Sequence, residues 1–133
     1  MSQTFNVTSQ ITSWDETNFE EENTEDKKLT LAKVEQQFSG DFIGASKIKY
    51  VMSYQNKTQA VFTGFETITV TINGKQGEFI VVHNGKFEQG VASSDFNVVT
   101  NSVTGDFTNI SGSGSFKSTE NGQAEYQFNL ELV

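Results

Sequence analysis

Apolar and polar residues alternate with a period of two along most of the chain. Between positions 60 and 72, one phase is apolar apart from one acid and the other phase is rich in threonine. The apolar phase holds Phe62, Ile68, Val70 and Ile72, and the polar phase holds Thr63, Thr67, Thr69 and Thr71. Successive side chains of a strand point to opposite faces, so this pattern predicts a half-buried strand.

The same alternation predicts eight strands, at about residues 3–13, 29–39, 42–54, 59–72, 78–87, 91–99, 111–118 and 124–132. Asn-Gly dipeptides at 73–74, 84–85 and 121–122 are typical of tight hairpins. Strands with one apolar face each bury that face by stacking two sheets or by closing a barrel. We expect an all-β fold with one domain over residues 1–133, an eight-stranded antiparallel closed β-barrel.

Three segments between or within the predicted strands need separate interpretation. Asn84-Gly85 either closes a hairpin or places a bulge in a longer strand that turns near Gly90, and we favour the bulge. A long loop is expected after the first strand, from Asp15 to Lys28, where seven of the seventeen acids lie. Residues 100–110 mix apolar residues with turn formers, so we expect a short helical turn near 103–110 that covers a barrel end.

Composition excludes several classes of function. The chain has 133 residues and no cysteine, which removes disulfides, thiolate catalysis and cysteine-based zinc sites. Its net charge is −8, and its nine cations are all lysine, whereas nucleic-acid binding needs a basic face. The polar start carries no secretory signal, and no apolar stretch approaches the roughly 20 residues of a membrane span. We expect a cytoplasmic protein that binds neither nucleic acid nor membrane.

Glu66 occupies the apolar phase of its strand, where a carboxylate needs a partner or a wet cavity. A two-residue loop at Asn73-Gly74 sets Glu66 opposite Val81 on the next strand, and a four-residue loop sets it opposite His83. Opposed residues share a face, so either loop puts Glu66 and the only histidine of the chain on one face. An odd-length loop would separate them, but Asn-Gly favours two residues.

A carboxylate beside an imidazole can exchange a proton with a substrate, fix the polar end of a ligand, or serve as a structural pair. Glu66 and His83 are therefore the candidate catalytic residues. The tyrosines have inward phases and either pack in the core or donate hydrogen bonds. The candidate ligand-binding residues are Tyr50, Tyr54, Phe62, Phe79, Val81 and Tyr126.

No metal or cofactor is expected. The acidic run from Asp15 to Asp26 lacks the spacing of a calcium loop and is typical of a solvated loop. One histidine excludes a two-histidine metal pattern, and no phosphate-binding loop is present. Trp14, just before the acidic run, is interpreted as a cap over the barrel end.

Several ordered segments carry a family resemblance. They are Ser13-Trp14-Asp15-Glu16, Phe38-Ser39-Gly40-Asp41, Gly64-Phe65-Glu66, the run from His83 to Gly90, Thr104-Gly105-Asp106-Phe107 and Ile110-Ser111-Gly112. Together they resemble a bacterial domain-of-unknown-function family of small β-barrels that is similar to plant allene oxide cyclase. The resemblance implies an eight-stranded barrel, a homodimer and a cavity for an oxidised lipid or another apolar molecule. It matches Glu66, His83, Gly85 and Phe87 to positions characteristic of the group. The chain has no proline, so a catalytic water arranged around a proline is absent.

Three hypotheses of function follow. In the first, the barrel binds a small apolar, oxidised-lipid-like molecule, with Glu66 and His83 as its polar anchor. In the second, the protein is an isomerase or cyclase of an unstable apolar substrate, with Glu66 as acid and base. In the third, it is a non-catalytic homo-oligomeric interaction module whose interface includes Val61 and Phe65 on the outer face.

Overall fold

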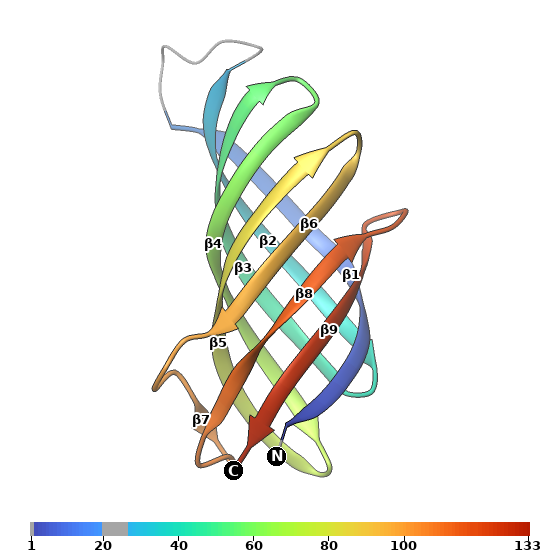
Figure 1. Cartoon of the computed structure of the whole chain (residues 1–133), viewed down its shortest axis with the longest axis vertical. Coiled ribbons are helices and arrows are strands. Elements are labelled where there is room, and N and C mark those ends of the chain that lie inside the picture. The colour runs from blue at the N-terminus through green and yellow to red at the C-terminus, as the bar shows by residue number, and fades with distance from the viewer. Residues whose placement is uncertain (1, 20–26) are drawn as a thin grey trace.

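Most of the described residues lie in β-strands (Figure 1). The computed structural model describes residues 2–19 and 27–133. Its strands are β1 (Gln3–Asn18), β2 (Lys28–Gly40), β3 (Ile43–Asn56), β4 (Gln59–Ile72), β5 (Lys75–Glu88), β6 (Val91–Val98), β7 (Thr104–Gly105), β8 (Ile110–Ser118) and β9 (Gln123–Leu132). The described residues contain no helix, and thus none long and apolar enough to cross a membrane.

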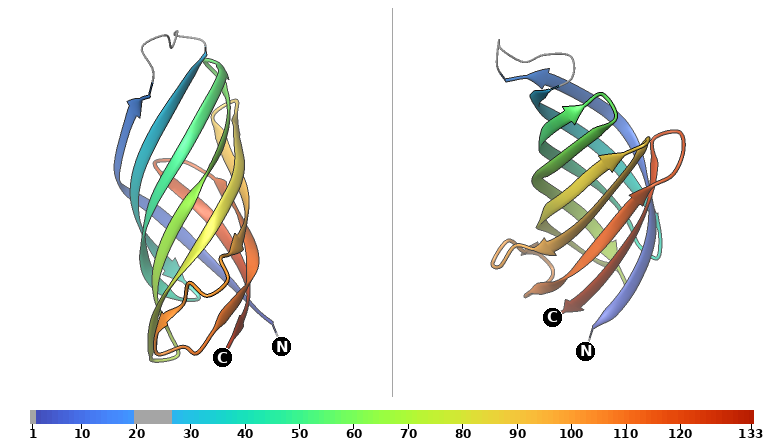
Figure 2. Two further views of the ribbon diagram at one scale, coloured as in Figure 1. Left: turned by 90° about the vertical axis from the view of Figure 1, so that its left-hand side faces the viewer. Right: turned by 45° about the horizontal axis from the view of Figure 1, so that its top comes forward.

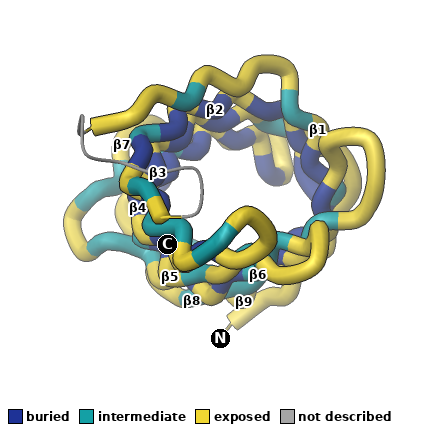
Figure 3. The backbone as a smooth tube through the Cα atoms, turned by 90° about the horizontal axis from the view of Figure 1, so that it is seen from above, coloured by how far each residue is buried: buried dark blue, intermediate teal, exposed yellow. Residues whose placement is uncertain are grey.

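Eight of these strands close into an antiparallel barrel. Neighbours run in the order β4-β3-β2-β1-β9-β8-β6-β5, and pairing of β4 with β5 closes the ring. Figure 2 shows the tilted strands surrounding one interior, and Figure 3 views that interior along the barrel axis. β7 lies outside the ring and pairs only with β5. The predicted eight-stranded closed barrel is confirmed.

The β4–β5 hairpin has the predicted two-residue turn. Asn73 and Gly74 have φ values of 52° and 79°, as a tight hairpin turn requires. Its register pairs Glu66 with Val81, which places Glu66 and His83 on the inner face together. The prediction that a two-residue loop puts Glu66 and His83 on one face is therefore confirmed.

The first strand is longer than predicted. β1 continues to Asn18, with a register shift between Ile11 and Ser13, and it pairs with β2 along this extension. The acidic composition suggested a loop from Asp15, but the bulge turns Glu16 inward, where Thr30 donates a hydrogen bond of 2.6 Å to it. The central part of the predicted loop, residues 20–26, lies outside the described residues.

The predicted helical turn near 103–110 is wrong. β6 pairs with β5 only from Val81 onward, and the segment after β6 covers the edge of β5 that is left. There the Asp106 amide donates to the Gln76 carbonyl at 2.7 Å, and the Gln76 amide donates to the Asp106 carboxylate at 2.9 Å. These bonds satisfy an exposed strand edge, which a helical turn would leave open.

Asn84-Gly85 forms neither a hairpin nor a bulge. β5 runs through both residues in unbroken register with β4 and β6, and the chain turns at Gln89 and Gly90. The longer strand was predicted correctly, but the bulge was not. Gly85 is needed for space, since a Cβ there would lie 2.3 Å from Cζ of Phe62.

The barrel interior is packed with aromatic rings at the end that holds both termini. Neighbouring rings in this cluster lie 5.2–6.4 Å apart between centroids, mostly tilted or edge-to-face. The cluster consists of Phe5, Phe38, Phe42, Phe79 and Phe128. This half of the barrel is a solid core, so any interior site lies toward the other end.

Candidate functional site

A cavity of about 420 Å³ occupies the other half of the barrel. It extends to the turns between β5 and β6 and between β8 and β9, where Gly90 and Gly122 line it. Much of its wall is apolar, formed by Val34, Ile48, Met52, Phe62, Phe116 and Ala124. Both its size and its lining are typical of a small-molecule pocket.

Gln36 and Tyr126 form the polar floor of this cavity. Nε2 of Gln36 donates hydrogen bonds to the Tyr126 hydroxyl at 2.8 Å and to Oε2 of Glu66 at 3.0 Å. The Tyr126 hydroxyl in turn donates to Glu66, lying 3.1 Å from Oε1 and 3.3 Å from Oε2. Gln36 and Tyr126 line the cavity, whereas Glu66, which both of them contact, does not.

Glu66 and His83 are in contact, as the sequence predicted. Oε1 of Glu66 lies 2.7 Å from Nε2 of His83, and both side chains are fully buried. Ser46 donates a further hydrogen bond to Oε2 of Glu66 at 2.5 Å. Neither member of the pair lines the cavity, so the pair lies beneath the floor and not at its surface.

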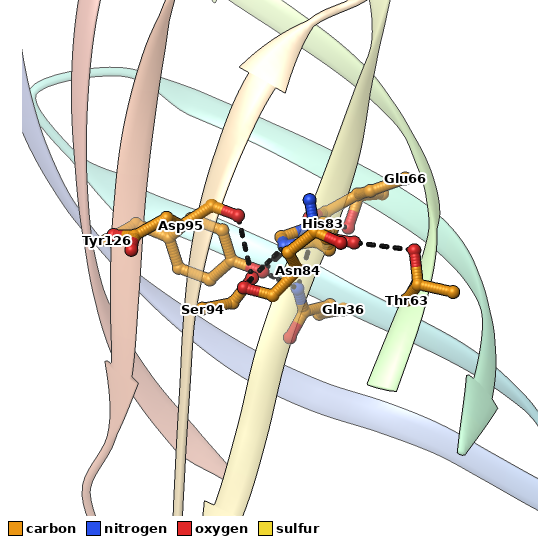
Figure 4. A network of polar contacts seen from close by, with 9 residues as sticks. Gln36, Thr63, Glu66, His83, Asn84, Ser94, Asp95 and Tyr126 are labelled. Atoms are coloured by element: carbon orange, nitrogen blue, oxygen red, sulfur yellow. Dashed lines mark hydrogen bonds and ion pairs between the residues drawn. The ribbon is translucent and has the colours of Figure 1, made fainter. Parts of the chain in front are cut away.

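The second ring nitrogen of His83 is also held. Nδ1 lies 2.9 Å from Oγ of Ser94, and that oxygen lies 3.2 Å from the carbonyls of both Asn84 and Asp95 (Figure 4). The rings of Phe96, Phe116 and Tyr50 surround the imidazole at centroid distances of 5.0, 5.4 and 5.6 Å. The orientation of His83 is therefore fixed by bonds at both nitrogens and by packing.

The hydrogen-bond inventory assigns protons to this network. Ser46, Gln36 and Tyr126 all donate to Glu66, which makes its carboxylate an acceptor and requires a proton on Nε2 of His83. Ser94 completes the hydrogen bonding of the ring at Nδ1. The buried carboxylate thus accepts hydrogen bonds from four side chains, and these bonds lower the cost of burying its charge.

The two buried tyrosines remain protonated at neutral pH. Burial raises the pKa of Tyr126 well above its usual value, and the negative charge of Glu66 raises it further. Burial and Glu66 raise the pKa of Tyr50 in the same way. Both phenols are therefore neutral hydroxyl groups and not anions.

The mouth of the cavity carries a second acid, Glu16. Burial raises the pKa of Glu16, but the opposing effects are larger, so the net shift is downward. These effects are hydrogen bonds from Thr30, Tyr54 and Trp14 and the positive charge of Lys28. The hydroxyl of Tyr54 donates to Oε2 of Glu16 at 2.8 Å, and Nε1 of Trp14 donates to Oε1 at 3.1 Å. Trp14 and Tyr54 both line the cavity, so this carboxylate holds two rings of its rim.

The predicted ligand-binding residues divide between the two halves of the barrel. Four of them line the cavity: Tyr50, Tyr54, Phe62 and Tyr126. Phe79 and Val81 do not line it, and their contact with a ligand stays a prediction. They point inward as predicted, but toward the packed half, where Phe79 lies edge-on to Phe128. Periodicity gives the face of a residue and not its depth along the barrel.

Sequence reasoning missed Gln36, Ser46 and Ser94. Gln36 occupies an apolar phase between Val34 and Phe38, so the same signal that singled out Glu66 was present there. Among the residues matched through the resemblance, Phe87 lines the cavity and Gly85 makes room for Phe62. In the described part of the chain, no group of three His, Cys, Asp or Glu side chains is placed to hold a metal ion.

Comparison with known proteins identifies the family. The model of the DUF3224 family, described as a protein of unknown function, matches residues 5–130. The chain belongs to this family. A family member of unknown function from Shewanella oneidensis MR-1, known from its crystal structure, shares the fold with a TM-score of 0.81 and 21% identity, over 100% of this chain and 98% of that one. No curated protein matches the chain. The family prediction is confirmed, and the similarity to allene oxide cyclase stays a prediction.

Proposed function

We propose that the protein binds a small, largely apolar molecule, of the oxidised-lipid kind, inside the barrel. The observation that carries this proposal is the cavity of about 420 Å³, which is walled by apolar side chains and closed below by Gln36 and Tyr126. In this arrangement Glu66 and His83 anchor the ligand indirectly, since they fix the two side chains that it touches.

Burial of the apolar part of the ligand sets the size of the binding free energy. Each methylene group that moves from water into an apolar site contributes about 0.8 kcal/mol. A ligand of several carbons therefore gains enough to offset the entropy lost on binding, provided that its polar end finds a partner. The polar atoms of Gln36 and Tyr126 at the floor of a largely apolar cavity supply that partner.

Two matched substitutions test the proposal. Ala124 lines the cavity, and Ala124→Phe fills part of it, whereas Ala45 is exposed on the outer face, and Ala45→Phe makes the same change there. Native mass spectrometry of protein purified from cells, followed by a thermal-shift screen of apolar alcohols, esters and oxidised lipids, should detect a ligand in the wild type and in Ala45→Phe. Ala124→Phe should lose it. A ligand that binds all three proteins equally, or no ligand for any, would count against the proposal.

Catalysis by Glu66 as acid and base is a second proposal. A proton passing between Glu66 and a bound molecule would have to travel through the Tyr126 hydroxyl, because Glu66 does not line the cavity. This geometry supports binding more than catalysis. Once a substrate is found, unchanged turnover in Glu66→Gln would remove Glu66 from the reaction.

The outer face supports a proposal of self-association. Val61 and Phe65 on β4 are 51% and 58% exposed, and Val51 lies on the neighbouring strand β3 at 36%. A homodimer would cover these side chains. Sedimentation of the wild type and of Phe65→Ser, over a range of concentrations, tests it, and a monomer at every concentration would contradict it.

We propose that the protein binds its ligand in the cytoplasm, the location expected from the sequence analysis. Fractionation of cells that make the native protein, followed by detection with an antibody, tests the location.

A further inference from the structure

The cavity wall carries no formal charge. Among the described residues, those that line it include no Lys, Asp, Glu or His. The polar side chains that reach it are neutral, and the deepest of them are Gln36, Tyr50 and Tyr126. A charged ligand group inside would have no counter-ion, and burying an unpaired charge is costly.

The charges just outside the wall disfavour anions. Glu66 lies directly beneath the floor, bonded to both Gln36 and Tyr126. Glu16 lies at the rim, where Tyr54 and Trp14 hold it. Lys28 lies 4.9 Å from the centroid of the Tyr54 ring, and its charge acts on Glu16. A ligand carboxylate in the cavity would therefore have an acid near it at the floor, Glu66, and another at the rim, Glu16. Lys28 already interacts with Glu16 and so offers the ligand little compensation.

The floor retains one hydrogen-bond acceptor. Nε2 of Gln36 has two protons, and its bonds to Glu66 and Tyr126 use both. No described residue donates to Oε1 of Gln36, yet no buried polar side-chain atom in the described part of the chain lacks a partner. Oε1 is thus accessible, and Gln36 lines the cavity. The Tyr126 hydroxyl, by contrast, already donates its hydrogen bond to Glu66.

From these observations we infer that the ligand is an uncharged molecule whose polar end is a hydrogen-bond donor, such as an alcohol, and that this donor binds Oε1 of Gln36. The inference rests on the proposed function and narrows its ligand class. It separates the protein from carriers that hold a fatty-acid carboxylate, and it selects hydroxylated over carboxylated forms of the same apolar chain.

A set of ligands with one chain and different ends tests the inference. Isothermal titration of the wild-type protein at pH 8 would compare 1-decanol, its methyl ether and decanoate. Decanol should bind about tenfold more tightly than the ether, since only the alcohol donates a hydrogen bond, and about 100-fold more tightly than the charged decanoate. If the ether binds as tightly as the alcohol, the ligand's polar end does not act as a hydrogen-bond donor. If decanoate binds as tightly as the alcohol, the cavity does not exclude charged ligands. If none of the three ligands binds, the proposed function itself fails.

The pH dependence supplies an independent readout. If only the protonated acid binds, the affinity for decanoic acid rises about tenfold for each pH unit lowered, until the carboxyl group titrates. The affinity for decanol should stay constant over the same range, which controls for changes in the protein. A decanoate affinity that does not change with pH would contradict the inference.

Two variants locate the interaction. Gln36→Met removes the acceptor and keeps the side-chain length. The affinity for decanol should therefore fall about tenfold, while the affinity for the ether is unchanged. Lys28→Gln removes the lysine at the rim and should change none of the affinities. Loss of decanoate binding in Lys28→Gln would show that a carboxylate pairs with that lysine, and would overturn the inference.

Discussion

The hydroxyl group of Tyr126 lies between the barrel cavity and the carboxylate of Glu66, 3.1 Å from Oε1. Tyr126 lines the cavity and Glu66 does not. In the proposed function, the buried acid acts on a ligand through a phenol that it orients, and burial together with the charge of Glu66 keeps that phenol protonated. Glu66 and His83, which stood out in the sequence, would then support the proposed binding surface, and Gln36 and Tyr126 would form it.

Removing this hydroxyl should weaken the fold. Tyr126→Phe leaves Glu66 with one donor fewer and Gln36 with one acceptor fewer inside the barrel. The free energy of unfolding in urea should fall by about 1–3 kcal/mol. Tyr54→Phe, at the rim, removes a bond to the partly exposed Glu16 and should cost less than about 1 kcal/mol. Equal losses would mean that the floor network contributes no more than an exposed hydrogen bond.

The Glu66–His83 pair should show strong energetic coupling. Glu66→Leu leaves the buried His83 without its acceptor, and loss of one partner of a buried pair costs about 3–5 kcal/mol. The double variant with His83→Leu removes both polar groups, so it should be more stable than the sum of the two single losses predicts, by about 2 kcal/mol. Unfolding in urea measures all four proteins of the cycle. Additive losses would show that the two residues do not act as a pair.

Stability should fall at alkaline pH. In the unfolded chain a tyrosine loses its proton near pH 10, whereas burial raises the pKa of Tyr50 and Tyr126 in the folded protein. Above about pH 10 the unfolded state binds fewer protons, so the free energy of unfolding falls, by up to about 1.4 kcal/mol per pH unit for each buried phenol. The contribution is complete at lower pH.

Two measurements check this pH dependence. Tyr126→Phe should show a shallower fall than the wild type, because it has one buried phenol fewer. In the wild type, phenolate absorbance from the buried tyrosines should appear together with the loss of circular dichroism. Complete ionisation of all three tyrosines in a protein that is still folded would contradict the account.

Gly85 leaves room for the ring of Phe62, which lines the cavity. A Cβ at this position would lie 2.3 Å from Cζ of Phe62 and 2.5 Å from the Ser93 carbonyl oxygen, so Gly85→Ala must displace the ring of Phe62, which lines the cavity. We expect a loss of about 1–3 kcal/mol and weaker ligand binding.

Gly74→Ala is the matched control. It meets no atom within 4 Å but strains a turn with a φ of 79°, so it should lower stability by about 1–3 kcal/mol without changing binding. Calorimetry of unfolding and ligand titration separate the two effects. Wild-type ligand affinity in Gly85→Ala would show that Phe62 does not shape the cavity.

The fold was predictable because local rules determine much of it. Alternation set the strands, and the Asn73-Gly74 turn set the register that joins Glu66 to His83. The exceptions depend on contacts distant in sequence. Glu16 belongs to a strand because Thr30 and Tyr54 bind it, and residues 104–105 form a strand because β6 leaves part of β5 unpaired.

The site was predictable only in part. Phase along a strand showed that Glu66, Tyr126 and Phe79 point inward, but it gave no depth. The boundary between the packed half and the hollow half depends on how rings from distant strands fill the barrel. Gln36 carried the same signal as Glu66, but a neutral side chain at an inward position is less conspicuous than a charged one.

A crystal structure of the wild-type protein grown with 1-decanol tests the central claim most directly. The account predicts that the alkyl chain lies inside the barrel against Phe62 and Phe116, with its oxygen within hydrogen-bond distance of Oε1 of Gln36. A barrel whose cavity is filled by its own side chains, with decanol absent or bound only to the outer face, would contradict it.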